Sequence, residues 1–473
     1  MTSPAAAFHP ADPDVPAANL RPIAKGAWAF YDFANTIFSF VVISYAMGLW
    51  LVRPEQLGEA NGQLAFSLAI LISVGANAVV SPILGALSDR GGGRRLPYLL
   101  LFTVLCVGPT AAIAFAGSFV GLVLFTIANF AYLSALIYYD ATLKLVSTPA
   151  TRGRMSGIGV GIGYCGTVFS GLLLFLFDIP VELRFVLAAV LYGLFAIPIF
   201  ALVREPGASD AQPVRLRDFV DSWDQLRTTI GHARQVPGLS RFLLGRFFYS
   251  DAVNTVIVVM SIVAVKAVGF SERTTVLILL SLTLVAIAMS FVWGRLSDGI
   301  GPRRTLIAIL ASWAVGLILG SLSLGLNGTD PATGAPVPAM PGIALFLVAG
   351  AILGSGLGGV QVADRVFMIR LSPPERVGEF FGVYGLVGKA SQVIGQLVFA
   401  LIVFLLFDSF GTLAYQVAIL SLIVTMLIGL WLVWPVSDRW AGSGELHRHG
   451  DSASVDTPPA RLAPDRAPLE DRS

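Results

Sequence analysis

Charged residues are scarce in this chain of 473 residues. Asp, Glu, Lys and Arg together make up 13% of it, whereas hydrophobic residues make up 55%. Soluble domains carry about 25% charged residues, so the composition excludes an ordinary soluble protein and places most of the chain in lipid. A helix that spans a bilayer needs about 20 apolar residues, and many stretches of this sequence are that long.

Cysteine and histidine are also rare. The two cysteines, Cys106 and Cys165, both fall in apolar segments, so no disulfide framework is expected. The four histidines all lie outside the apolar segments. We therefore expect no metal centre and no cofactor, and any proton switch inside the membrane would rest on carboxylates. The net charge of +2 is too small to suggest nucleic-acid binding.

Motifs for nucleotide chemistry are missing or misplaced. No Gly-x-x-x-x-Gly-Lys-Ser/Thr run is present, so ATP-driven transport has no support, and no nucleophile–base set suggests an enzyme. Two Gly-x-Gly-x-x-Gly patterns, at 161–166 and 354–359, lie inside apolar segments, where small residues allow close helix contact. The N-terminus lacks the order of a secretory signal, so we expect the first span to act as the insertion signal.

Long apolar segments fill most of the chain. They predict an all-α membrane protein with about twelve transmembrane helices in two pseudo-symmetric six-helix bundles. The expected spans are residues 26–52, 63–88, 96–117, 119–146, 156–177, 181–203, 241–266, 273–296, 303–326, 341–370, 379–407 and 411–435.

The positions of the basic residues support this layout. With a cytoplasmic N-terminus, only Arg53, Arg184, Lys266 and Arg273 fall on the outer side of the membrane region, as the positive-inside rule requires for an even number of spans. We expect a multi-pass protein of the cell (plasma or inner) membrane with both termini cytoplasmic. The predicted domains are a cytoplasmic segment 1–25, a bundle 26–203, a cytoplasmic linker 204–240, a second bundle 241–435 and a disordered cytoplasmic tail 436–473.

Three signals recur in the same order in the two halves. They are an aspartate before an Asn-Thr pair, a Gly-x-Leu-Ser-Asp motif before an Arg pair, and a proline before two glycines. The offsets are similar, 251 − 32 = 219, 294 − 85 = 209 and 374 − 149 = 225. Such offsets indicate a tandem repeat, as in transporters whose site lies between repeats.

The second of these signals carries a family resemblance. Gly85-Ala86-Leu87-Ser88-Asp89-Arg90, followed by Arg94-Arg95, resembles the signature loop of the major facilitator superfamily, with one residue inserted before the Arg pair. Residues 294–304 resemble its echo between spans eight and nine. The stretch 28–36, Trp-Ala-Phe-Tyr-Asp-Phe-Ala-Asn-Thr, with Phe38-Ser39 after it, is similar to one branch of that superfamily. This branch contains the autophagy-related fungal vacuolar effluxers and their bacterial relatives.

The resemblance implies a twelve-helix secondary transporter with alternating access. Fungal members are implicated in amino-acid export from the vacuole, and most bacterial members have no assigned substrate. We expect a secondary active transporter of a small polar solute, with amino acids as a candidate class and the proton as a candidate coupling ion. The alternative is a non-transporting membrane receptor or sensor that reuses the fold. The expected partners are a small-molecule substrate and the lipid bilayer, without nucleic acid, and we expect a monomer.

Polar residues within the spans are the candidates for the transport site. Asp32, Asn35 and Thr36 stand at i, i+3 and i+4 and therefore share one helix face. Asp32 is interpreted either as a proton or cation coupling site, or as a helix cap or ion-pair partner. Asp251 and Asn254 repeat this face in the seventh span, with the same two interpretations.

Lys389 lies about ten residues into the eleventh span, near mid-bilayer, where a lysine costs roughly 2.5–3.5 kcal/mol on insertion scales. Gln392 and Gln396 follow on the same stripe. In one interpretation Lys389 faces the cavity, where it pairs with Asp32 or Asp251 or contacts an anionic group of the substrate. In the other it is a snorkelling or purely structural lysine.

The resemblance also implies an inner gate. In the superfamily, charged residues at the inner ends of spans four and ten pair with the signature loops, and these pairs hold the two halves closed on the inner side. Asp89 and Asp298 are expected in the same latch, where an aspartate near a helix N-terminus gains from the helix dipole. The residues given this role are Asp89, Arg90, Arg94, Arg95, Asp140, Asp298, Arg303, Arg304, Asp364 and Arg365.

Overall fold

The computed structural model describes residues 15–90, 94–177, 179–206, 231, 234–329, 336–373, 376–411 and 413–437. Most of the predicted N-terminal segment, linker and C-terminal tail therefore lies outside the described residues. The side chains of Asp89, Arg90 and Gln396, which were predicted to belong to the latch and the cavity, lie outside them as well.

The first half of the described chain is helical throughout. It opens with a short 3₁₀ helix, η1, and contains one long broken helix and five further long helices. The elements are η1 Ala17–Leu20, α1 Pro22–Phe38, η2 Ser39–Ala46, α2 Met47–Leu51, α3 Glu59–Arg90, α4 Leu96–Ile113, α5 Ser118–Ala141, α6 Leu143–Val146, α7 Arg152–Leu176 and α8 Val181–Leu202.

The second half repeats this order, again with one broken helix first. A two-residue antiparallel strand pair closes one of its loops. The elements are α11 Leu239–Val263, η3 Ala264–Val268, α12 Glu272–Ile300, α13 Pro302–Gly325, β1 Gly328–Thr329, β2 Pro336–Val337, α14 Met340–Leu371, α15 Val377–Phe410 and α16 Leu413–Val433.

Ten of the helices in the described residues are long and apolar enough to cross a membrane. Six of these ten helices lie in the first half and four in the second. Helices α11 and α15 are of similar length, and with them the second half also has six long helical segments. Large apolar side chains such as Leu64, Phe119 and Val190 point outward and are more than half exposed, which is the surface that contact with lipid requires. The prediction of an all-α membrane protein is confirmed.

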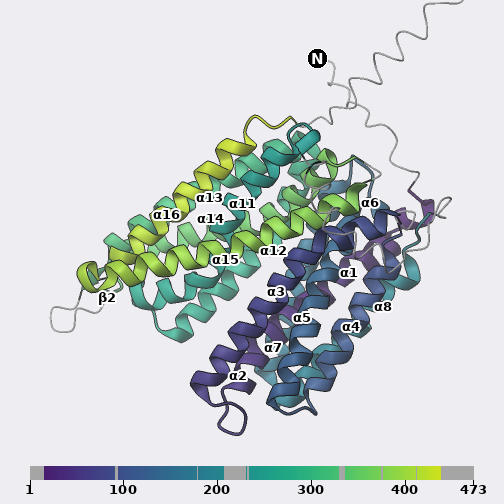
Figure 1. Ribbon diagram of the computed structural model, residues 1–473. Coiled ribbons are helices and arrows are strands. Elements are labelled where there is room, and N and C mark those ends of the chain that lie inside the picture. The colour runs from purple at the N-terminus through teal and green to yellow at the C-terminus, as the bar shows by residue number, and fades with distance from the viewer. Residues whose placement is uncertain are drawn as a thin grey trace, which may run out of the picture.

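The two halves form two bundles that lie side by side (Figure 1). Helices α1–α8, in purple to blue, pack mainly on one another, as do α11–α16, in teal to yellow. Four helices join the bundles most closely, because α3 packs along α15 and α7 packs along α12. In Figure 1 the ends marked by α2 and β2 lie far apart, whereas the other ends of the bundles converge.

The first helix of each bundle carries a π-helical segment. Segment η2 begins at Ser39, 39 − 32 = 7 residues after Asp32, and η3 begins at Ala264, 264 − 251 = 13 residues after Asp251. Short π segments inside helices often occur at functional sites because they break the regular hydrogen-bond ladder. Each half thus has a π segment in its first helix, but the two segments lie at different distances from the repeated aspartate.

Candidate functional site

Glycines allow the bundles to touch at their converging ends, which we call the latch end. A methyl group placed on Gly85 of α3 would lie 2.0 Å from the carbonyl oxygen of Gly378 of α15. A methyl group on Gly294 of α12 would lie 2.8 Å from the carbonyl oxygen of Gly153, at the start of α7. Only glycine permits such a close approach of two backbones. The glycine of the signature motif in each half thus packs against the glycine of the third repeat signal in the other half.

Asp298, at the end of α12, caps α7 of the other bundle. Its carboxylate accepts the backbone N–H of Gly153 at 2.7 Å and that of Arg154 at 3.0 Å, and it also pairs with the Arg154 Nε at 3.0 Å. These N–H groups are the unpaired donors at the beginning of a helix, where the dipole favours a negative charge. Asp298 therefore lies at a helix N-terminus across the bundle interface, and its role in a gate stays a prediction.

Two further predicted latch aspartates, Asp140 and Asp364, pair with arginines outside the signature loops. Asp140 of α5 lies 3.0 Å from Arg365 of α14, and Asp364 of α14 pairs with Arg246 of α11. Neither aspartate pairs with an arginine of the signature loops among the described residues. Instead, Arg365 of α14 pairs with Asp140, whose side chain is 17% exposed, and Arg246 of α11 pairs with the buried Asp364.

The arginines of the two signature loops have other positions. Arg94 and Arg304 are exposed, and Arg303 donates through Nη2 to the carbonyl oxygen of Trp434 in its own bundle. The backbone N–H of Arg95 donates to Glu205 Oε1 at 2.5 Å, and that of Leu96 donates to the same oxygen at 3.1 Å. The loop is thus tied to the segment that follows α8.

Arg365 crosses from one bundle into the other. Its guanidinium lies 5.8 Å from the ring centre of Trp28 and 5.5 Å from that of Tyr139, whose rings stack 4.7 Å apart. Its partner Asp140 is also on the first bundle. An arginine that is both paired with a carboxylate and placed over aromatic faces is held on two sides. Trp28 comes from the stretch 28–36 that carries the family resemblance, so that stretch forms part of the bundle interface.

Asp32 lies deeper in the membrane region than the latch end, on α1 and beside α7. Its side chain is 8% exposed, and a methyl group on Gly163 would lie 3.2 Å from its Cγ. It makes no hydrogen bond or ion pair among the described residues, although Arg365 and Asp140 are close enough to act on it electrostatically. Asp32 is therefore a buried carboxylate without a direct partner.

The neighbours of Asp32 on the predicted face have separate environments. Asn35 is 3% exposed, and its Oδ1 has no hydrogen-bond partner in the part of the chain that the structure describes. Thr36 donates from Oγ1 to the carbonyl oxygens of Gly163 at 2.5 Å and Phe33 at 3.0 Å. Asn35 thus offers a free acceptor, whereas the Thr36 hydroxyl is used in packing α1 against α7.

The repeated motif of the second half does not reproduce these surroundings. Asp251 of α11 is 6% exposed, and its neighbour is Thr425 of α16, within the same bundle. Asn254 is partly buried, and the hydroxyl of Thr255 is buried without a hydrogen-bond partner among the residues described. The structure therefore places Asp32 near the bundle interface and Asp251 in the contact between α11 and α16.

Lys389 of α15 reaches the first bundle, where its Nζ donates to Oδ1 of Asn77 on α3. Neither Asp32 nor Asp251 is within ion-pair distance of it among the described residues, so the pairing predicted with these aspartates is not found. Gln392 is exposed. A second contact between the bundles occurs where Gln361 Nε2 donates to the Tyr164 hydroxyl at 2.8 Å.

Sequence reasoning missed Asn77, Arg246, Tyr164 and Gln361. The available signal was the same one that identified Lys389, namely a polar side chain within an apolar span. For the amides and the tyrosine this signal is weak, because such residues also occur in helix contacts that serve only packing.

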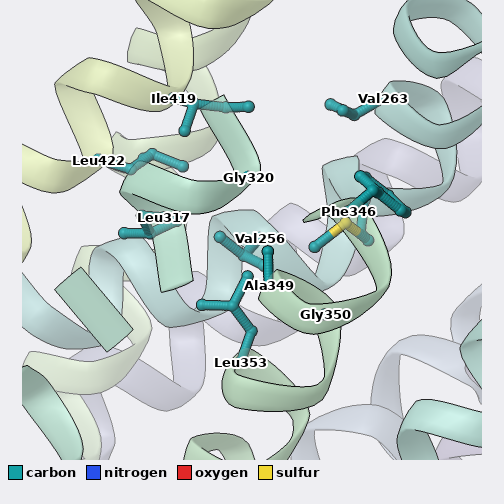
Figure 2. Close-up of a pocket in the computed structure, with 11 residues that line it drawn as sticks. Val256, Val263, Leu317, Gly320, Phe346, Ala349, Gly350, Leu353, Ile419 and Leu422 are labelled. Carbon is teal, nitrogen blue, oxygen red and sulfur yellow. The ribbon is translucent and has the colours of Figure 1, made fainter. Parts of the chain in front are cut away.

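The cavity in Figure 2 is not part of this site. Apolar side chains and glycines of α11, α13, α14 and α16 line it, among them Val256, Leu317, Phe346 and Leu422. It lies inside the second bundle and offers no polar group to a solute. Among the described residues, no three His, Cys, Asp or Glu side chains are grouped as a metal site would require.

Comparison with known proteins identifies the family. The model described as "Vacuole effluxer Atg22 like" matches residues 63–441. The chain is 26% identical over 426 residues to the "Uncharacterized MFS-type transporter YxiO" of Bacillus subtilis (strain 168), covering 86% of this chain and 93% of the relative. It is 25% identical over 303 residues to "Autophagy-related protein 22-1" of Penicillium rubens, covering 59% of this chain and 48% of the relative. The chain thus spans about half the length of this fungal relative.

Solved structures agree on the fold. The crystal structure of the human organic anion transporter MFSD10 (TETRAN) superposes with a TM-score of 0.66 at 15% identity, covering 87% of this chain and 100% of that chain. At this identity the likeness concerns the fold alone. The resemblance inferred from residues 28–39 and 85–95 is confirmed, and the chain belongs to the Atg22-like vacuole effluxer family, a branch of the major facilitator superfamily of transporters.

Proposed function

We propose that this transporter carries a small polar solute by alternating access, with Asp32 as the proton-coupling group and Lys389 as the contact for an anionic group of the solute. The observation that supports the proposal is a cluster of six charged side chains within the membrane region, which we call the interface cluster. Charged groups in a bilayer are costly and mark the paths of ions and substrates. The members are Asp32, Asp140, Arg246, Asp364, Arg365 and Lys389.

The charges of the interface cluster suggest the solute class. The cluster holds three acids and three bases, and two ion pairs use four of them. Asp32 and Lys389 remain, one of each sign and neither with an opposite charge at ion-pair distance among the described residues. A zwitterion offers a group to each, so amino acids are the first class to test. The family description as a vacuole effluxer is compatible with this choice.

The contacts between the bundles favour one conformational state. The hydrogen bonds and ion pairs that join the bundles, as far as the structure describes them, lie between the latch end and the level of Lys389. The positive-inside count makes the latch end cytoplasmic. We propose that the protein is a monomer of the cell membrane with both termini cytoplasmic, and that these contacts belong to its outward-facing state.

The first experiment identifies the solute. Purified protein is screened by thermal shift against amino acids, sugars and peptides, because a ligand that binds only the folded form raises the melting temperature. Hits are then tested for flux in proteoliposomes with and without a pH gradient. Flux separates a transporter from a receptor, since a receptor would show binding and a thermal shift without any movement of solute.

The second experiment tests the coupling. Asp32→Asn should abolish accumulation driven by the pH gradient while leaving solute exchange between the two sides, because the amide cannot carry the proton. Asp251→Asn is the matched variant, since Asp251 lies in the contact between α11 and α16, and it should retain accumulation. Gradient-driven flux that is unchanged in Asp32→Asn would remove Asp32 from the coupling role.

A further inference from the structure

Asn77 holds a position that the proposed function does not yet use. This residue of α3 is fully buried. Its Oδ1 accepts a hydrogen bond from the ammonium group of Lys389, which lies on α15 of the other bundle. One turn nearer the latch end, the Ser81 hydroxyl donates to the carbonyl oxygen of Gly382 at 3.1 Å. The contact between Asn77 and Lys389 therefore lies farther from the latch end than the contact between Ser81 and Gly382.

The orientation of the Asn77 amide is fixed by its own neighbours. Its Nδ2 donates to the Ser134 hydroxyl at 2.6 Å and to the carbonyl oxygen of Phe130 at 3.2 Å, both on α5. A carbonyl oxygen can only accept, so the nitrogen must face α5. The amide oxygen must then face Lys389. Asn77 is held by its own bundle and presents a neutral oxygen to a cation of the other bundle.

Lys389 differs in this respect from the other two cations of the interface cluster. Arg365 has the carboxylate of Asp140, and Arg246 has that of Asp364. The bond from Lys389 to Asn77 joins a cation to a neutral oxygen, whereas a bond to a carboxylate adds the attraction between two opposite charges. A carboxylate that enters the cavity would therefore compete well for Lys389, whereas it would compete poorly for either arginine.

We propose that Asn77 is a specificity residue whose amide oxygen occupies the place of the solute's anionic group in the empty transporter. The anionic group of the solute replaces Asn77 as the partner of Lys389. This exchange removes a polar link between α3 and α15, so that the latch end opens. A neutral analogue cannot make this exchange. The inference rests on the proposed function, and it adds the chemistry by which solute binding releases the closed state.

The test measures the conformation without requiring transport. Spin labels on Glu55→Cys and Leu326→Cys, in a Cys165→Ser background, report the separation of the bundles at the ends remote from the latch. Both positions are exposed loop or helix-end residues outside the site. A long distance corresponds to the closed latch end, and a short distance corresponds to the open latch end. Double electron–electron resonance gives the ratio of the two populations.

Two substitutions at Asn77 should act in opposite directions. Asn77→Ala removes the acceptor of Lys389 and should shift the ratio about tenfold toward the short distance, the size expected for one charge-assisted hydrogen bond. Asn77→Asp supplies a carboxylate to Lys389 and should leave only the long distance. If Asn77 served only to join α3 to α5, both variants would shift the ratio in the same direction, and that result would overturn the proposal.

Asn129→Ala is the matched control. Asn129 is a second buried amide between α3 and α5, and its Nδ2 donates to the Ser73 hydroxyl at 2.7 Å within the first bundle. It should keep the wild-type ratio.

Acetate and acetamide, compared at equal ionic strength, test whether the anionic group is required. Acetate should move the wild-type ratio toward that of Asn77→Ala and acetamide should not, and equal effects of the two probes would overturn the assignment.

Failure of this inference is distinct from failure of the proposed function. A wild-type protein that moves no solute in proteoliposomes would refute the transport proposal, whatever the Asn77 variants do. A wild type that carries a solute, together with Asn77 variants that keep the wild-type distance ratio, would refute the inference alone.

Discussion

The carboxylate of Asp298 accepts the backbone N–H of Gly153 at 2.7 Å, although the two residues belong to different bundles. The same carboxylate holds Arg154 by two further contacts. One side chain therefore satisfies donors at the N-terminus of α7 and joins the bundles at the latch end. This contact is made only while the latch end is closed, because separation of α7 from α12 removes it.

Substitution of Asp298 should loosen the latch end. Asp298→Ala removes all three contacts, and we expect it to cost the closed state about 1–3 kcal/mol, as for a helix cap that carries a charge. A cysteine introduced as Ser156→Cys, at a fully buried position of α7, should then react faster with a permeant maleimide in a Cys165→Ser background. Asp298→Asn keeps an acceptor without the charge and should lie between Asp298→Ala and the wild type. Equal reactivity in all three proteins would contradict this role.

Gly85 should tolerate no side chain. A methyl group there would lie 2.0 Å from the Gly378 carbonyl oxygen, so Gly85→Ala must push α3 away from α15. We expect loss of transport together with faster labelling from the latch end. Gly75→Ala is a control on the same helix, because a methyl group at Gly75 meets nothing within 4 Å. That substitution should keep transport and stabilise α3 by up to about 1 kcal/mol. Wild-type transport by Gly85→Ala would show that the seam is not closely packed in the working protein.

The sequence alone could predict the spans and the repeat, because apolar length and repeated motifs are local properties. The sequence could not predict which of the repeated motifs contact each other in the folded protein. Gly85 and Gly378 both belong to repeat signals, yet their contact joins different signals in different halves. No periodic pattern in the sequence indicates a contact between two segments that are so far apart in the chain.

The interface cluster shows the same limit. Lys389 could be selected as a residue of interest because a lysine in an apolar span is costly. Its partner could not be selected, since Asp32, Asp251 and Asn77 are all polar residues in apolar spans. The choice depends on the rotation of each helix about its axis, and successive residues of a helix point in directions about 100° apart. A repeat in sequence therefore did not give Asp251 the surroundings of Asp32.

The segment after α8 supplies a prediction that depends on pH. Glu205 lies outside the spans, where burial raises the pKa of its carboxyl above the usual value, while the backbone N–H groups of Arg95 and Leu96 oppose this rise. An acid with a raised pKa in the folded state favours folding when it is protonated. Its ionisation therefore lowers stability as the pH rises through the range above 4.5, the ordinary pKa of this group.

Glu205→Gln should accordingly gain stability relative to the wild type as the pH rises from 4 to about 7, because the amide oxygen still accepts from the signature loop and carries no charge. Glu205→Ala should lose about 1–3 kcal/mol at all pH values, since it leaves the two N–H groups without their acceptor. Thermal melting in detergent across this pH range measures both effects. A constant difference between Glu205→Gln and the wild type would exclude titration of Glu205 as the cause.

The pair between Asp140 and Arg365 is the strongest candidate for an interaction that holds the bundles together from within the membrane. Their charges lie 3.0 Å apart with side chains that are 17% and 7% exposed. Removal of one partner of a buried pair leaves an uncompensated charge and costs about 3–5 kcal/mol. Asp140→Asn and Arg365→Gln should each destabilise the protein by that amount, and the double variant should cost less than the sum because neither charge remains. The coupling energy from the four melting curves measures the pair directly. Additive effects would mean that Trp28 and Tyr139, rather than Asp140, hold Arg365 in place.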